Sequence, residues 1–347
     1  MQNEITARQP LLDENGNPAN PGWCRRNLYE YNIEKHSPSI MRLKEWDFYQ
    51  VCNGEIMVQI NLFNISLATC ATFGFVDLQT GRKFDTMSVE LFTPDKNRLN
   101  RNGDCENYIS YSRGATAITF DVTDECHHLK FEGKCKGKKL YAEFFCSRLP
   151  HHESITIATP FDKPGHFFYT NKINCLATDG YVVFGDEKFE FTSDNTYTVL
   201  DWGRGIWPYQ NMWYWANGST LIDGKRFGFE LTWGFGNTDT ATETALFYDG
   251  ICHKISDVHL EKDPEIGSKW MEDWHFISSD SRLDLTMKPF YDHYSNLMPL
   301  NLFGMKTHQV HGIWSGFVIL DDGTKLEIKD MYAFCEKVYN KIGRAHV

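Results

Sequence analysis

The segment from Asp201 to Trp215 gathers side chains that could bind an apolar molecule and carry out acid chemistry on it. Indole rings present a broad apolar face whose quadrupole attracts a cation, and a carboxyl group kept away from water can protonate an alkene. We therefore expect Asp201 to be a proton donor and Arg204 to anchor a polar head group. The aromatic wall around them would consist of Trp202, Trp207, Tyr209, Trp213 and Trp215. The alternative is that these rings only pack a contact between two domains, with Asp201 and Arg204 paired.

Two shorter segments place polar residues at positions that suit a binding site. In the segment 169–174, Lys172 and Asn174 are two residues apart, so they share a face if the segment is a strand. We expect both to contact substrate, although a solvated face would have the same pattern. Glu243 falls in the most strand-like part of its region, 242–249. Burial there would raise its pKa and make it a second proton donor, whereas a carboxylate at a barrel rim would have no such role.

Motifs for metals and cofactors are absent from the sequence. There is no phosphate-binding loop, and Trp233-Gly-Phe-Gly-Asn237 lacks the third glycine and the following helix of a dinucleotide fingerprint. The adjacent histidines at 127–128 and 151–152 would point to opposite faces of a strand, so neither pair could share a metal ion. Neither a His-Glu-X-X-His pair nor a Gly-X-Ser-X-Gly elbow occurs. We therefore expect no metal and no cofactor.

The elements that must position these residues are predicted to be strands. Apolar side chains alternate with polar ones at Ile118, Phe120 and Val122, which is the pattern of a strand with one buried face. The one helical candidate is the tail 332–342, which could also be a strand. Glycine can supply a positive φ in four hairpin turns, at Gly185-Asp186, Asp223-Gly224, Asp249-Gly250 and Asp322-Gly323. The chain is therefore predicted to be all-β.

Three landmarks occur twice in the same order, which indicates an internal repeat. Trp46-Asp-Phe-Tyr49 corresponds to Trp213-Tyr-Trp215, and each precedes an apolar run that ends in a turn. The third landmark is a glycine-led apolar run before a hairpin, at 180–184 and again at 316–320. Each copy has about the size of one up-and-down β-barrel, whose closure removes exposed strand edges. We expect an extended arm over residues 1–45, a first barrel over 46–201 and a second over 202–347.

Composition excludes several classes of partner. The formal net charge is −11 and no long basic run occurs, so a nucleic-acid partner is not expected. No stretch of 18 apolar residues is present, so an integral membrane association is not expected. The ten cysteines form no Cys-X-X-Cys pair, and the opening residues lack the pattern of a signal peptide. We therefore expect reduced thiols in a cytoplasmic protein.

The run Asp201-Trp-Gly-Arg-Gly-Ile-Trp-Pro-Tyr209 resembles a family known as domain of unknown function 2804. Supporting similarities are Gly22-Trp-Cys-Arg-Arg26, Trp46 and Asn171-Lys-Ile-Asn174. That family is distantly similar to carotenoid 1,2-hydratase and AttH-like proteins, so the resemblance implies two lipocalin-like (calycin-type) barrels packed side by side. It does not imply an activity, because fold alone does not carry function. At Glu243-Thr-Ala245 the chain departs from the pattern, since an Asn would be expected after the Glu.

Together these features predict a protein that binds an apolar small molecule, terpenoid or lipid-like. A cofactor-independent hydratase, cyclase or isomerase would use Asp201 or Glu243 as its acid. The alternatives are a non-catalytic carrier of a lipid or small molecule, and an interaction scaffold whose barrels are filled. A buried carboxyl group with a shifted pKa beside an apolar pocket would favour the enzyme over the carrier.

Overall fold

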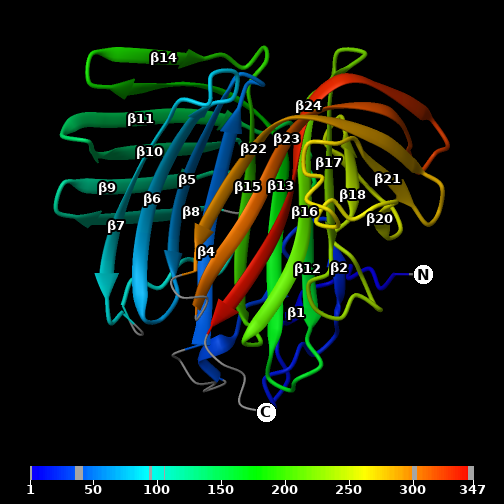
Figure 1. Cartoon of the computed structure of the whole chain (residues 1–347). Helices are drawn as coiled ribbons and strands as arrows, with labels where there is room; N and C mark the ends of the chain where they lie inside the picture. The colour runs from blue at the N-terminus through cyan, green and yellow to red at the C-terminus, as the bar shows by residue number, and fades with distance from the viewer. Residues whose placement is uncertain (1, 36–41, 94–95, 105, 299–302, 343–347) are drawn as a thin grey trace.

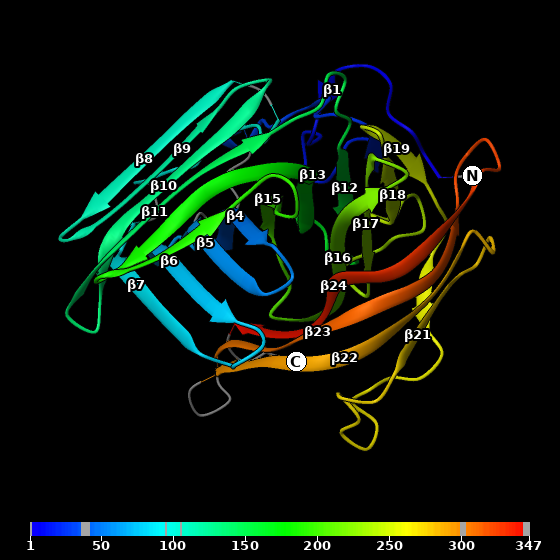
Figure 2. The ribbon, with the colours of Figure 1, turned by 90° about the horizontal axis from the view of Figure 1, so that it is seen from above.

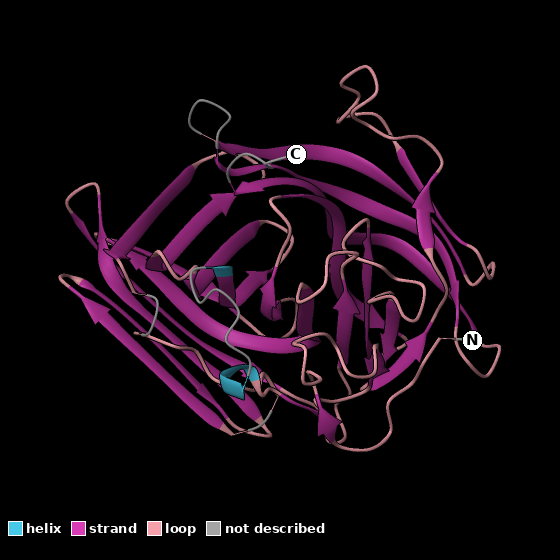
Figure 3. Ribbon diagram, turned by 90° about the horizontal axis from the view of Figure 1, so that it is seen from below, coloured by secondary structure: helices cyan, strands magenta, loops and turns pink. Residues whose placement is uncertain are grey.

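The computed structural model describes residues 2–35, 42–93, 96–104, 106–298 and 303–342. Strands make up nearly all of the regular structure (Figure 3), and the expected all-β fold of two lipocalin-like, antiparallel units is confirmed. Among the described residues, no helix is long and apolar enough to cross a membrane.

The first sheet follows the order β7-β6-β5-β4-β15-β13-β11-β10-β9-β8, with β12, β14 and β2 attached beside it. It curls until β10 meets β7, where the Cys135 thiol donates to the Asp85 carbonyl at 3.2 Å. The strands are β2 (Gly22–Cys24), β4 (Leu43–Cys52), β5 (Ile56–Asn64), β6 (Ala68–Asp77), β7 (Lys83–Leu91), β8 (Asn107–Arg113), β9 (Thr116–Val122), β10 (Cys126–Cys135), β11 (Lys138–Ser147), β12 (Ile155–Pro160), β13 (Phe167–Phe184), β14 (Glu187–Phe191) and β15 (Tyr197–Ile206). The arm before β4 also contains β1 (Gln9–Pro10), β3 (Tyr29–Glu30) and the short 3₁₀ turn η1 (Ile33–Lys35).

The second sheet follows the order β19-β18-β17-β16-β24-β23-β22-β21-β20. Its two edge strands are joined by residues 255–257 alone, so the sheet bends round until its edges approach each other. The strands are β16 (Gln210–Ile222), β17 (Lys225–Trp233), β18 (Ala245–Tyr248), β19 (Ile251–Lys254), β20 (Val258–Leu260), β21 (Trp274–Ser278), β22 (Leu283–Leu297), β23 (Phe303–Ile319) and β24 (Lys325–Ile342).

The hairpin turn predicted at Asp223-Gly224 is present in the structure. Asp223 and Gly224 have φ of 52° and 74°, as the two central residues of a tight two-residue hairpin require, and they join β16 to β17. The helix considered for the tail 332–342 is wrong, because these residues belong to β24. β24 pairs with β16 on one side and with β23 on the other, so its backbone N–H and C=O groups form hydrogen bonds to neighbouring strands and not within a helix.

Side chains fill the interior of both barrels. In the first barrel, aromatic rings such as Phe73, Phe120, Phe131 and Phe144 form one buried cluster. In the second, Phe229, Phe276 and Trp314 form another. A small barrel can either hold a ligand or be filled by its own side chains, and these two are packed.

The outer faces of the two sheets meet along a contact that we call the seam. β4, β13 and β15 contribute one wall, and β16, β17, β23 and β24 contribute the other. Figure 1 shows β22–β24 lying across the first sheet, and the view from above separates the two curled sheets on either side of this contact (Figure 2). Apolar side chains from both walls pack there, for example Phe48 and Val199 against Trp215 and Phe334.

Candidate functional site

Five of the predicted site residues come together in the seam, four of them in one group centred on Lys172. Lys172 on β13 is the register partner of Asp201 on β15, and its Nζ lies 2.7 Å from the Asp201 carboxylate. The same Nζ lies 3.8 Å from Oε2 of Glu243 and 4.5 Å from the centre of the Trp215 ring. The side chains of Lys172 and Glu243 are each only 5% exposed. Glu243 belongs to the loop between β17 and β18, not to a strand as the sequence suggested.

A third carboxyl group, Glu230, lies on the opposite wall and was not found from the sequence. Its Oε2 accepts from Asn217 Nδ2 at 2.9 Å and from Asn174 Nδ2 at 3.4 Å. Asn217 Nδ2 also donates to the Asn174 side-chain oxygen at 2.6 Å. The sequence placed Lys172 and Asn174 on one face, and both do reach the seam, across a β-bulge that begins after Ile173. The hydrogen bond between the Asn174 and Asn217 side chains therefore joins the two sheets next to Glu230.

Glu336 on β24 is a further carboxyl group that sequence reasoning missed. It accepts from Gln309 Nε2 at 3.1 Å, and the Gln309 oxygen accepts from Gln59 Nε2 at 3.1 Å. Gln59 Nε2 also donates to Gln50 Oε1 at 2.9 Å. This amide chain runs from one sheet to the other beside the carboxyl groups. We call Lys172, Asp201, Glu230, Glu243 and Glu336 the seam cluster.

Burial raises the pKa of three carboxyl groups in the seam cluster into the neutral range. Desolvation is the main cause in each, with Lys172 opposing it. The pKa rises to about 7 for Glu243, to about 8 for Glu230 and to about 7 for Glu336. Burial works against the charge on Lys172, but the neighbouring carboxylates, Asp201 first, outweigh it and raise the pKa of Lys172. The cluster therefore holds a charged lysine beside acids that retain protons near pH 7.

Several polar atoms in and around the seam cluster are buried without a hydrogen bond to any described residue. They are Oε1 of Glu230, Oε2 of Glu243 and the indole Nε1 of Trp215. Oε2 of Glu230 accepts two amide N–H bonds, so the proton of the neutral acid belongs on Oε1. Buried polar atoms in native proteins are nearly always paired. These atoms are therefore where a bound molecule or water would be held.

Of the remaining predicted residues, Trp213 donates a hydrogen bond to Glu336, whereas Trp202, Arg204, Trp207 and Tyr209 lie outside the cluster. Asp201 and Arg204 do not pair, because residues three apart in a strand point to opposite faces. Arg204 and Trp202 face the interior of the first barrel, where Arg204 donates to Asp47 at 2.8 Å and to the Asn100 side chain at 2.7 Å.

The aromatic wall is likewise divided. Trp207 and Trp213 pack with Phe235 at one end of the seam, and Tyr209 lies under the Arg42 guanidinium. Of the four tryptophans, Trp215 is the one that faces Lys172.

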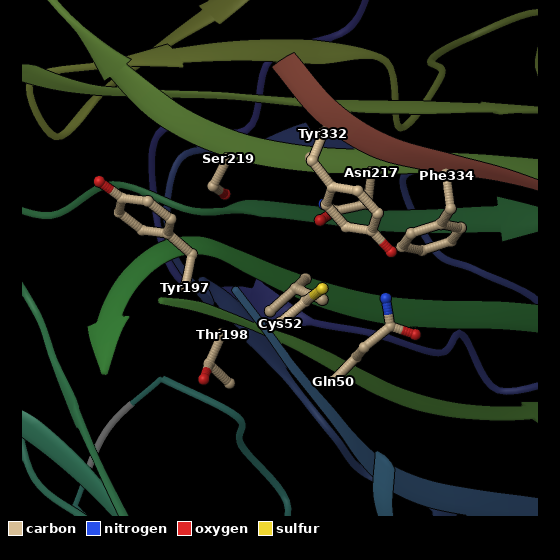
Figure 4. Close-up of a pocket in the computed structure, with 10 residues that line it drawn as sticks. Gln50, Cys52, Tyr197, Thr198, Asn217, Ser219, Tyr332 and Phe334 are labelled. Carbon is tan, nitrogen blue, oxygen red and sulfur yellow. The ribbon is translucent and has the colours of Figure 1, made fainter. Parts of the chain in front are cut away.

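A small crevice opens beside the cluster (Figure 4). Its volume is about 30 Å³, and its walls come from both sheets. Asn217, which bonds Glu230, forms part of one wall, and Gln50, the end of the amide chain, forms part of the other. The remaining lining residues are Cys52, Tyr197, Thr198, Val199, Gly218, Ser219, Tyr332 and Phe334. A space of this size and polarity suits a water molecule.

The described part of the chain contains no group of three or more His, Cys, Asp or Glu side chains arranged to hold a metal ion. The carboxyl groups of the seam cluster face a lysine, which already occupies the place that a cation would take. Proton transfer is the chemistry that this set of side chains supports.

A family model described as "Domain of unknown function (DUF2804)" matches residues 2–342, and no curated protein matches the chain. Among solved structures, the chain is similar to a putative AttH from Nitrosomonas europaea, with 12% identity, a TM-score of 0.48, and coverage of 91% of this chain and 97% of that one. It is also similar to kievitone hydratase from Nectria haematococca, with 12% identity, a TM-score of 0.45, and coverage of 96% and 97%.

Proposed function

The chain belongs to the domain of unknown function 2804 family, and we propose that it is a cofactor-independent acid–base catalyst whose site is the seam cluster. Its substrate would be an apolar, alkene-containing small molecule of terpenoid or lipid type, and its reaction a hydration or an isomerisation. The proposal rests on Glu243, a buried acid with a pKa of about 7 whose Oε2 lies 3.8 Å from Lys172 Nζ and accepts no hydrogen bond from the residues that the structure describes. An acid whose pKa matches the working pH is the most effective proton donor.

Glu243 and Lys172 carry the chemical steps of this reaction. The Glu243 carboxyl gives its proton to one alkene carbon, and the electron pair of the double bond forms the new C–H bond. Lys172, whose ammonium already lies over the Trp215 ring, stabilises the new Glu243 carboxylate, and the positive charge is left on the other carbon. In hydration, the oxygen of a water molecule from the crevice bonds to the cation and its proton returns to Glu243. In isomerisation, Glu243 instead removes a proton from the adjacent carbon.

A second candidate function is a non-catalytic scaffold, in which the seam cluster only joins two filled barrels. The size of the crevice, about 30 Å³, favours it, because an apolar substrate would need the walls of the seam to separate. The two candidates differ in one measurable property. A scaffold transfers no proton to a bound alkene.

The test is deuterium incorporation from D₂O into a panel of terpenoid alkenes and unsaturated fatty acids, read by mass spectrometry. The panel is chosen after native mass spectrometry of the purified protein for co-purifying apolar molecules. We expect incorporation with the parent protein and a loss of about 100-fold or more in Glu243→Gln. Glu327→Gln, at an exposed site on β24, is the matched control and should retain it. Equal incorporation by parent and Glu243→Gln would refute the role of Glu243, and no incorporation with any alkene would favour the scaffold.

A further inference from the structure

The loop that carries Glu243 is held by a second lysine, Lys254, besides its contact with Lys172. Lys254, the last residue of β19, donates from Nζ to Thr242 Oγ1 at 2.8 Å and to the Thr244 carbonyl at 2.6 Å. It also donates to the Ile255 carbonyl at 2.9 Å. Two of the three acceptors belong to the residues on either side of Glu243. Two of the three N–H groups of the lysine therefore fix this short segment, and the third bonds the backbone next to Lys254.

The N-terminal arm holds the same loop. The Gln2 side-chain oxygen accepts from the Thr242 backbone N–H at 2.8 Å, and its amide donates to the Ile255 carbonyl at 3.0 Å. The Asn3 backbone N–H donates to the Thr240 carbonyl at 2.8 Å. Thr242 and Glu243 are buried although no strand pairing surrounds them. Their placement thus depends in part on the Gln2 side chain and the Asn3 backbone, which lie more than two hundred positions away in the sequence.

We propose that Lys254 and Gln2 are positioning residues that fix the Glu243 carboxyl group beside Lys172. The proposal rests on the proposed function only for the chemical use of Glu243. The holding of the loop is a property of the unliganded protein and can be measured without a substrate. A segment outside any ladder exchanges its amide protons rapidly unless other groups hold it, so both anchors are open to a direct test.

The experiment is amide hydrogen exchange of the full-length protein, followed in the segment 240–245. We expect about tenfold faster exchange in this segment in Lys254→Met and in Gln2→Ala, because each variant removes hydrogen bonds to it. The matched controls are Lys225→Met on an exposed hairpin of the same sheet and Gln79→Ala on an exposed turn. Both controls, and the β10–β11 hairpin in every variant, should exchange as in the parent.

A second measurement separates positioning of the carboxyl group from simple packing. Glu243 faces Lys172 and Asp201 on the first sheet, Glu230 on β17 and Lys254 on β19. Burial lowers the pKa of Lys254 to about 7, so its positive charge acts on Glu243 below that pH. A carboxyl-carbon NMR titration of Glu243 should therefore show a higher midpoint in Lys254→Met, which removes this charge. Lys254→Arg, which keeps the charge and the donors, should restore both the titration and the exchange rate. Gln2→Ala removes no charge, so it should shift the midpoint only if the carboxyl group moves, and it therefore separates positioning from the loss of a neighbouring charge.

Unchanged exchange at 240–245 in Gln2→Ala and Lys254→Met would overturn the proposal, as would a Glu243 midpoint equal to that of the parent. If Lys254→Met does not fold, Gln2→Ala and Lys254→Arg still decide the matter. The two proposals fail separately. Full retention of deuterium incorporation by Glu243→Gln removes the catalytic role and leaves the anchoring intact, whereas unaltered exchange removes the anchoring alone.

Discussion

Arg204 and Asp201 leave β15 on opposite faces, so each takes part in a different network. Arg204 is fully buried in the first barrel and pairs with Asp47, which is also buried. Arg204→Met would leave the Asp47 carboxylate without its cation in a dry interior. We expect the free energy of unfolding to fall by about 3–5 kcal/mol, measured by urea denaturation.

The control for this variant is an ion pair of the same type at the surface. Arg82 and Glu187 form a bidentate pair with both side chains more than 40% exposed. Because water replaces such contacts readily, Arg82→Met should unfold at the same urea concentration as the parent. Equal losses in the two variants would contradict the assignment of Arg204 to a buried pair.

The raised pKa of Glu230 predicts how the free energy of unfolding changes with pH. Its pKa is about 8 in the folded protein, mainly through burial, against 4.5 ordinarily. Between these values the native state holds a proton that the unfolded state lacks, so this residue lowers stability as pH rises. Gln does not ionise, so the stability of Glu230→Gln does not fall in this way. The free energy of unfolding of the variant minus that of the parent should therefore increase with pH, by up to about 1.4 kcal/mol per pH unit between pH 4.5 and 8.

Urea unfolding of both proteins at several pH values measures this difference. Glu327→Gln, on the exposed part of β24, should follow the parent at every pH. Parallel curves for Glu230→Gln and the parent would mean that Glu230 is ionised in the native state at neutral pH.

At the scale of the element, one glycine decides how β15 packs. A Cβ on Gly203 would lie 1.9 Å from the Trp46 ring, which is itself packed against Phe168 and Trp207. Because the ring would have to leave these contacts to make room, Gly203→Ala should lower stability by about 1–3 kcal/mol, read as a lower melting temperature. Gly74→Ala on β6 is the control, since its Cβ would meet nothing closer than 3.8 Å. A melting temperature of Gly203→Ala equal to that of Gly74→Ala would show that the indole can shift.

The strands and turns were predictable because their signals are local. Period-two alternation and paired turn residues such as Asp223-Gly224 act within a few positions, and the structure follows both. If 201–206 is taken as a strand, the sequence also predicts which side chains of β15 point to the same face of the sheet. The sequence suggested instead a junction between domains, and this led to the mistaken pairing of Asp201 with Arg204.

The seam cluster was only partly predictable. Lys172, Asn174, Asp201 and Glu243 carried visible signals, but which of them meet depends on how the two sheets pack. Glu230 had a signal that was overlooked, since it is the one charged residue in the apolar run Phe227–Trp233. Cross-sheet packing brings these residues together, and no short-range pattern encodes it.

For the molecule as a whole, the seam should make unfolding a single event. Trp23 and Ile157 from the arm and the first sheet share a buried cluster with Ala245 and Phe247 from the second. Separating the sheets would expose this cluster and leave Lys172 and the carboxyl groups with fewer partners. We expect one calorimetric transition, with calorimetric and van't Hoff enthalpies that agree. Two resolved transitions, or fluorescence and circular dichroism midpoints that differ, would contradict a shared core.

The pairing of β4 with β15 has a consequence for synthesis on the ribosome. β4 pairs with β5 at once, but its other edge stays open until β15 has been translated. At roughly 5–20 residues per second this interval is on the order of ten seconds. β16 waits in the same way for β24, near the end of the chain. An open edge is a template for pairing with another chain, so nascent copies on neighbouring ribosomes are most exposed to each other during these two intervals.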